Sequence, residues 1–107
     1  MSDQLGLVFS ALSDPTRRQM LEALIRDGST SVPALTAELP ITRQAVAKHL
    51  SALSTAGLVE RAPGGSGREV HYQLRPGALG PAASWIRIAD AAWERRLDRL
   101  KSSLETP

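Results

Sequence analysis

ITRQAVAKHLSAL (residues 41–53) is the stretch on which the fold of this 107-residue chain depends. Thr42 is a good N-cap, and the apolar residues that follow it recur at helical spacing: Val46, Leu50 and Leu53. Gly57 then offers a left-handed C-terminal cap. The pattern predicts a helix over residues 43–56 that buries one face and leaves the other in water.

The helix just before this one follows almost without a break. Ser31 is suited to cap it, and Pro40 ends it, so only a tight turn separates the two helices. Its inward residues are expected to be Val32, Leu35 and Leu39. Residues 31–56 therefore predict a helix-turn-helix.

Two more helices are expected at the start of the chain. Residues 5–12 place apolar side chains at steps of three and four, which is typical of a short amphipathic helix. Asp14 is a good N-cap for the next helix, Pro15 suits its first position, and Gly28 stops it.

After Gly57 the hydrophobic period changes from that of a helix to that of strands. Residues 58–61 and 69–74 are predicted strands, joined by the turn-forming loop 63–67 with a flexible tip. They form a β-hairpin, or wing, within residues 58–75. A last helix is expected over residues 82–104. The whole chain, residues 1–107, is then one mainly α-helical domain with a small β-hairpin, which is a winged helix-turn-helix.

Three stretches of the sequence, which follow one another in this order of helices and strands, carry a resemblance to a known family. They are LSDPTRR at residues 12–18, the quoted stretch at 41–53 with its H-L-x-x-L ending, and A-G-L-V at 56–59 followed by the returning strand up to residue 74. Together they resemble the ArsR (arsenic-repressor-like) family of bacterial transcription regulators. The resemblance covers more than half of the chain and implies double-stranded DNA as a partner and a homodimer as the working form.

The outward face of the helix at 43–56 offers groups that suit the edges of DNA bases. Glutamine pairs bidentately with adenine, and lysine or arginine with guanine. Residues at the start of such a helix meet the bases first, and small residues allow a close approach. A polar outer face is by itself more often only a solvated face, but the tight turn before it and the hairpin after it favour DNA. We expect this face to bind DNA through Thr42, Arg43, Gln44, Ala47, Lys48 and Ser51.

Further DNA contacts are expected from basic residues outside that helix. Residues 42–75 hold five basic and two acidic residues, although the whole chain has a net charge of only +2. Arg68 follows the glycines of the wing, where it can reach a phosphate or the minor groove, or can simply be solvated. Thr16 and Arg17 are candidate phosphate contacts, with Arg17 alternatively paired to Glu22 or Asp14. Arg61 and His71 on the strands are further candidates.

Composition and spacing exclude several other kinds of site. The chain contains no cysteine, so it has no thiolate metal site. Metal sensors of the resembled family have a second kind of site on the last helix, which needs histidines. No histidine follows His71 in this chain, and Ala92 stands at the position of the first of them. We therefore expect no metal and no cofactor, and we expect His49 to be a packed, hydrogen-bonded residue. The chain has no catalytic constellation, so we expect no enzyme. No apolar run approaches the roughly 20 residues of a membrane span, and the absence of cysteine fits a cytoplasmic protein.

The apolar residues on the first and last helices have few partners within the rest of the domain that could bury them. We expect residues 1–12 and 82–104 to form a homodimer interface, the alternative being that both helices pack only within the monomer. The interface residues are predicted to be Leu5, Val8, Phe9, Trp85, Ala89, Trp93, Leu97 and Leu100. The predicted function is a repressor that binds a palindromic promoter site as a homodimer. The alternative function is a metal- or small-ligand-responsive sensor of the same fold, with an effector that the sequence does not identify.

Overall fold

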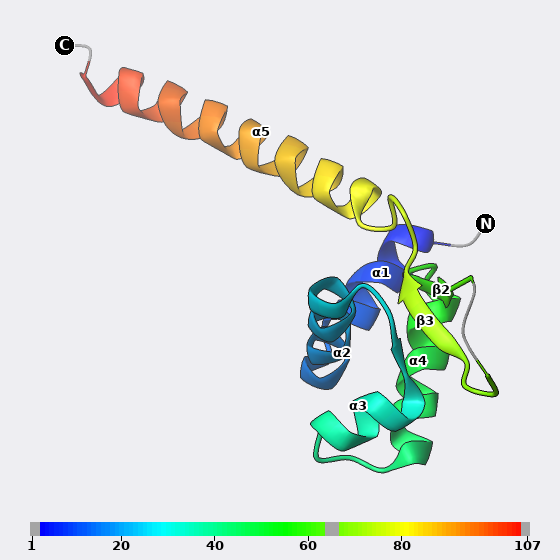
Figure 1. Cartoon of the computed structure of the whole chain (residues 1–107). Helices are drawn as coiled ribbons and strands as arrows, with labels where there is room; N and C mark the ends of the chain where they lie inside the picture. The colour runs from blue at the N-terminus through cyan, green and yellow to red at the C-terminus, as the bar shows by residue number, and fades with distance from the viewer. Residues whose placement is uncertain (1–2, 64–66, 106–107) are drawn as a thin grey trace.

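The computed structural model describes residues 3–63 and 67–105 of the chain. Within these residues, five helices and three strands follow one another in the order α1 (Gln4–Leu12), α2 (Pro15–Asp27), β1 (Thr30–Ser31), α3 (Val32–Glu38), α4 (Arg43–Thr55), β2 (Val59–Arg61), β3 (His71–Leu74) and α5 (Gly80–Glu105). Figure 1 shows α1 to α4 and the sheet gathered into one body, from which α5 projects. This arrangement is a winged helix-turn-helix, as the sequence predicts.

The predicted helix boundaries are confirmed to within about two residues, and local capping explains them. Asp14, Ser31 and Thr42 each accept a hydrogen bond from a backbone N–H three residues further on. Gly57 follows α4 with a φ of +76°, in the left-handed region that favours glycine. One cap was not predicted: the Asp3 side chain accepts from the Gly6 N–H at 2.8 Å and begins α1.

The predicted hairpin is confirmed as β2 and β3, and a third strand that was not predicted, β1, joins it within the described residues. Strand β3 lies in the middle and pairs antiparallel with β2 on one side and with β1 on the other. Strand β1 is only two residues long and lies directly before α3, so it shows no alternation that a sequence reading can detect. The hairpin strands are also shorter than predicted, and the tip at residues 64–66, predicted to be flexible, lies outside the described residues.

The core lies where α1 to α4 meet the sheet. Its largest fully buried side chains come from three different helices and the turn after α4: Met20, Leu24, Leu35, Val46, Leu53 and Leu58. The predicted inward residues of α3 pack here, Leu35 fully buried and Val32 and Leu39 half-buried. This core orients α4, because its inner face is packed against both α2 and α3.

Helix α5 makes the molecule long. It contacts α1 near its own start, but Figure 1 shows the rest of it running away from the domain. The molecule is therefore 72 Å long but only 29 and 26 Å across. The predicted helix over residues 82–104 is confirmed, with two more residues at its start and one at its end.

Candidate nucleic-acid interface

Helix α4 has one buried face and one face in water. Val46 and Leu53 are fully buried, and Leu50 is only 3% exposed. The hydroxyl of Thr42 accepts a hydrogen bond from the Ala45 N–H at 3.1 Å and fixes the start of the helix. The opposite face is exposed and brings together the residues predicted to bind DNA, namely Thr42, Arg43, Gln44, Ala47, Lys48 and Ser51.

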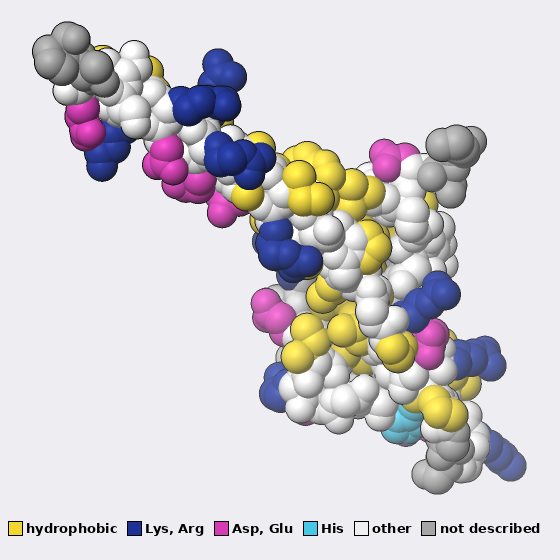
Figure 2. Space-filling view, turned by 90° about the horizontal axis from the view of Figure 1, so that it is seen from above, with side chains coloured by type: hydrophobic (Ala, Val, Ile, Leu, Met, Phe, Trp, Pro, Cys, Tyr) yellow, Lys and Arg dark blue, Asp and Glu magenta, His cyan; other side chains and the backbone are white. Residues whose placement is uncertain are grey.

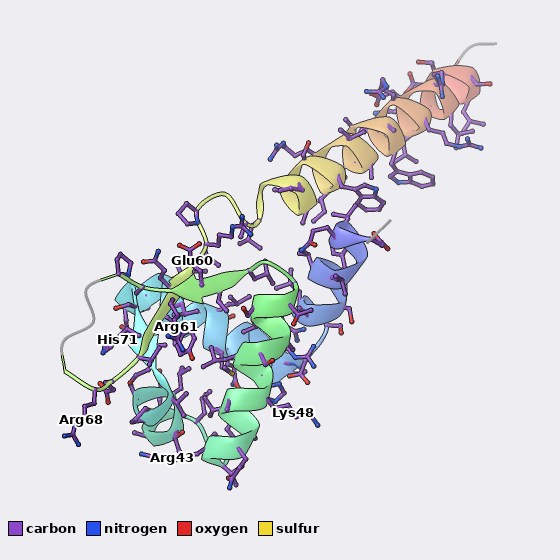
Figure 3. All side chains as sticks on the ribbon, turned by 90° about the vertical axis from the view of Figure 1, so that its right-hand side faces the viewer. Arg43, Lys48, Glu60, Arg61, Arg68 and His71 are labelled. Atoms are coloured by element: carbon purple, nitrogen blue, oxygen red, sulfur yellow. The ribbon has the colours of Figure 1, made fainter. Side chains whose placement is uncertain are left out.

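Two grooves flank this exposed face. One lies between α4 and the sheet, has a volume of about 360 Å³, and includes Ala47 and Arg61 in its lining. The other lies between α4, α1 and α2, has a volume of about 410 Å³, and includes Arg17 and Lys48. Figure 3 shows Lys48 projecting from α4 on the side away from the hairpin, with Arg43 at the N-terminal end of the helix. Basic side chains therefore border α4 on both sides.

The wing adds a separate basic group. Arg68 is exposed in the segment between β2 and β3, and Figure 3 shows it at the far end of the hairpin from α5. Arg61 is exposed on β2, whereas His71 is half-buried with its Nε2 3.3 Å from a Glu69 carboxylate oxygen. Arg68 and Arg43 thus lie on different elements but reach toward the same end of the domain (Figure 3).

Arg17 and Thr16 lie in the first turn of α2, and both are half-buried. The alternative pairing of the Arg17 side chain with Glu22 or Asp14 was wrong, because its Nε donates to His49 Nδ1 at 3.3 Å. Only the backbone N–H of Arg17 contacts Asp14, donating to its carboxylate at 3.1 Å. The prediction for His49 is confirmed: this residue is half-buried and hydrogen-bonded.

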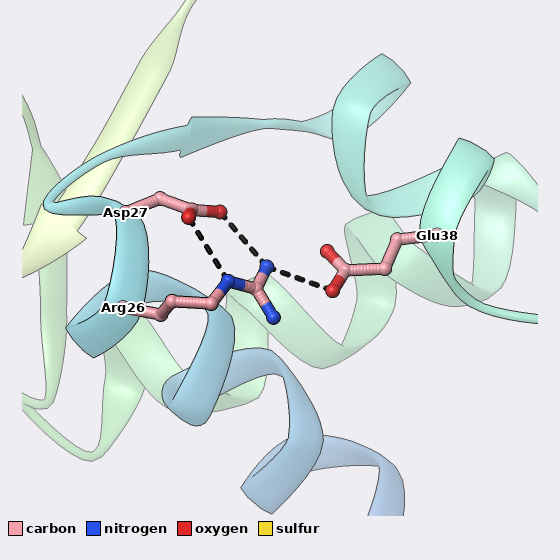
Figure 4. A network of polar contacts seen from close by, with 3 residues as sticks. All are labelled: Arg26, Asp27 and Glu38. Carbon is pink, nitrogen blue, oxygen red and sulfur yellow. Dashed lines mark hydrogen bonds and ion pairs between the residues drawn. The ribbon is translucent and has the colours of Figure 1, made fainter.

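An ion-pair network ties the end of α2 to the end of α3, the helix that packs against α4. The Arg26 guanidinium donates to both Asp27 oxygens at 2.9 Å and lies 2.7 Å from Glu38 Oε1 (Figure 4). Hydrogen bonds to Asp27 and then to Glu38 raise the pKa of Arg26, and Arg26 lowers the pKa of Asp27. These side chains are about half exposed, so the network contributes little to stability.

The described part of the chain offers no built metal centre. Within residues 3–63 and 67–105, no three histidine, aspartate or glutamate side chains are placed to hold a metal ion, and the whole sequence lacks cysteine. In the same residues, none of the helices combines the length and the hydrophobicity of a membrane span.

The predicted interface residues on α1 and α5 differ in exposure. Val8 is 4% exposed and packs in the monomer core, which leaves little of its surface for a dimer contact. Leu5 and Phe9 are half-buried, and the Phe9 ring meets Trp85 edge-on with centroids 5.7 Å apart. The others on α5 are exposed, namely Trp85, Ala89, Trp93, Leu97 and Leu100. Figure 2 shows hydrophobic side chains gathered where α5 leaves the domain; along its remainder the acidic groups follow one edge, and most of the basic groups follow the other.

Comparisons with known proteins agree with this geometry. A family model described as a helix-turn-helix domain matches residues 12–62. The HTH-type transcriptional regulator Rv2034 of Mycobacterium tuberculosis is 39% identical over 83% of this chain and 78% of its own length. An ArsR-like transcriptional regulator from Rhodococcus sp. RHA1 has a solved structure that is similar with a TM-score of 0.82 and 41% identity, covering 95% of this chain and 91% of that one. The chain belongs to the ArsR family of helix-turn-helix transcriptional regulators.

Other relatives of this ArsR-family chain include the transcriptional repressor SdpR of Bacillus subtilis, which is 28% identical over 74% of this chain and 84% of its own length. Membership makes the chain a DNA-binding transcriptional regulator and not an enzyme. Sequence reasoning missed the groove beside α4, because its walls come from α1, α2 and α4. The residues that line this groove are far apart in the sequence, and no sequence pattern predicts that they lie together.

Proposed function

We propose that this ArsR-family regulator is a repressor that binds a palindromic promoter site as a homodimer. The observation that carries the proposal is the exposed face of α4, which presents an amide, an ammonium, a guanidinium and a hydroxyl beside a small alanine. The name of SdpR, a transcriptional repressor, supports repression over activation. A regulator of this kind acts on the chromosome, so we place it in the cytoplasm.

In this proposal α4 enters the major groove with its N-terminal residues foremost. A B-DNA major groove about 12 Å wide admits one α-helix. Arg43, Gln44 and Lys48 read base edges, with Thr42, Ala47 and Ser51 close to them. Arg68 on the wing and Thr16 and Arg17 on α2 contact phosphates, which sets register and carries no sequence information.

The dimer part of the proposal places two copies of α4 in successive major grooves. Half-sites would then lie about 34 Å apart, or one helical turn of DNA. The exposed apolar side chains of α5 support this arrangement, since seven large ones on this helix are in water in the monomer: Trp85, Ile86, Ile88, Trp93, Leu97, Leu100 and Leu104.

The test starts from a selection of binding sites out of random duplex DNA with the purified protein. We expect a palindrome to be enriched, and Gln44→Ala or Lys48→Ala to weaken binding to it by roughly 1–3 kcal/mol each. Arg68→Ala should weaken binding to the palindrome and to random DNA alike, because it contacts phosphate. Gln19→Ala is the matched control, since Gln19 is also an exposed glutamine but lies on α2. Normal binding by both α4 variants would show that the wrong helix face has been assigned.

A further inference from the structure

The contact between Arg17 and His49 joins the start of α2 to the middle of α4. The Arg17 Nε donates to His49 Nδ1 at 3.3 Å, and both residues are half-buried. Asp14 lies beside them and accepts the Arg17 backbone N–H at 3.1 Å. This N–H is the main reason that the pKa of Asp14 is lowered, and the Thr16 backbone N–H adds to the effect.

The direction of this hydrogen bond follows from the chemistry of arginine. A guanidinium can only donate, so Nδ1 is the acceptor of this hydrogen bond. The contact occupies Nε of Arg17. Among the described residues, none accepts a side-chain hydrogen bond from the two terminal nitrogens of Arg17. Arg17 is thus held at one nitrogen while the other two remain available for an anion.

The surroundings of Arg17 suit a phosphate. Arg17 shares the groove between α1, α2 and α4 with Lys48, and hydroxyl groups complete its polar lining: Ser10, Ser51 and Thr55. No described residue in the lining carries a carboxylate. Lys48 and Ser51 also belong to the exposed face of α4, so the groove continues directly from the proposed DNA-reading surface.

We propose that His49 is a positioning residue for DNA binding, which holds the Arg17 guanidinium so that Arg17 grips a backbone phosphate in this groove. The inference rests on the proposed function and adds a residue that does not itself touch DNA. Arginine binds phosphate through paired N–H groups, which requires a defined orientation. Because His49 orders Arg17 before DNA arrives, less side-chain entropy is lost on binding.

The test uses random-sequence duplex DNA of about 30 base pairs, roughly three helical turns, because a phosphate contact needs no operator. Binding is measured by fluorescence anisotropy between about 50 and 200 mM salt. Arg17→Ala should lower the slope of log affinity against log salt by about 0.9, the value for one phosphate contact. His49→Phe, which keeps a ring but removes the acceptor, should weaken binding about two- to tenfold, the range expected for ordering one long side chain.

Two comparisons separate positioning from a purely structural role. His49→Asn places an amide oxygen near the position of Nδ1 and should restore binding to within about twofold. In the Arg17→Ala background, His49→Phe should have no further effect, because the residue that it positions is gone. Melting temperatures of all variants are measured in parallel. Arg17→Lys, which leaves His49 intact, keeps the charge but loses the fork and should bind more weakly than the unchanged protein.

The outcomes are distinct. If His49→Phe binds as the unchanged protein does, or if its loss persists in the Arg17→Ala background, the positioning role is wrong while the proposed function stands. If the salt slope of Arg17→Ala equals that of the unchanged protein, Arg17 makes no phosphate contact and this inference is wrong. If the unchanged protein does not bind the duplex at all, both the proposed function and this inference are wrong.

Discussion

Replacing Trp93 by aspartate should split the proposed dimer. Trp93 lies in the middle of α5, beyond the part that contacts α1, and is 57% exposed in the monomer. A tryptophan buries up to about 250 Å², so about 140 Å² of Trp93 is still in water. At about 25 cal/mol per Å², full coverage by a second copy would stabilise the dimer by about 3.5 kcal/mol per protomer, or about 7 kcal/mol for the symmetric pair.

The aspartate removes this apolar area and adds a charge to the same surface. Because each 1.4 kcal/mol is a factor of ten, a loss of about 7 kcal/mol raises the dissociation constant by about five orders of magnitude. Size-exclusion chromatography with light scattering measures the mass directly at micromolar protein. We expect a dimer for the unchanged protein and a monomer for Trp93→Asp, which should also lose binding to a palindromic site.

Ala91→Asp is the matched control for this experiment. It adds the same charge to the same helix, but Ala91 lies about 160° around α5 from Trp93, at about 100° per residue. This variant should remain a dimer. The reasoning is refuted by a monomeric unchanged protein at micromolar concentration, or by a Trp93→Asp variant that still dimerises.

Three further predictions concern stability and metals. Leu53→Ala should lower the free energy of unfolding by about 2–5 kcal/mol in urea titrations because Leu53 is fully buried, whereas Ile25→Ala, at a residue 61% exposed, should change it by less than about 0.5 kcal/mol. The pKa of Asp14 is lower in the folded chain, chiefly through the Arg17 N–H, so the unfolded chain binds more protons and stability should fall as the pH drops below about 4. Thermal melts should show a weaker acid dependence for Asp14→Asn, which keeps a capping side chain without the titration, and equal acid dependence would contradict the role of this carboxylate. Added zinc, cadmium or nickel should leave DNA affinity unchanged in anisotropy titrations, and a stoichiometric metal that alters affinity would revive the sensor alternative.

Sequence by itself predicted the features that depend on neighbouring residues. The start of α4 follows from Thr42 and its end from Gly57, since a cap acts on backbone groups only three or four positions away. The exposed face of α4 follows in the same way, because the spacing of Val46, Leu50 and Leu53 dictates which side chains point outward. The family resemblance rests on these same local motifs.

Tertiary structure decided which surfaces meet. Val8 shares a helical face with Leu5 and Phe9. The periodicity of the sequence predicts that this face is buried, but it does not say whether the monomer core or a second copy of the chain buries it. In the fold, the monomer's own core buries Val8. Strand β1 exists only because β3, about 40 residues later, supplies hydrogen-bonding partners for Thr30 and Ser31. The Arg17–His49 contact spans 32 residues, and it forms because the core packs α4 against α2. Contacts of this kind depend on the whole packing arrangement, so no local pattern in the sequence reports them.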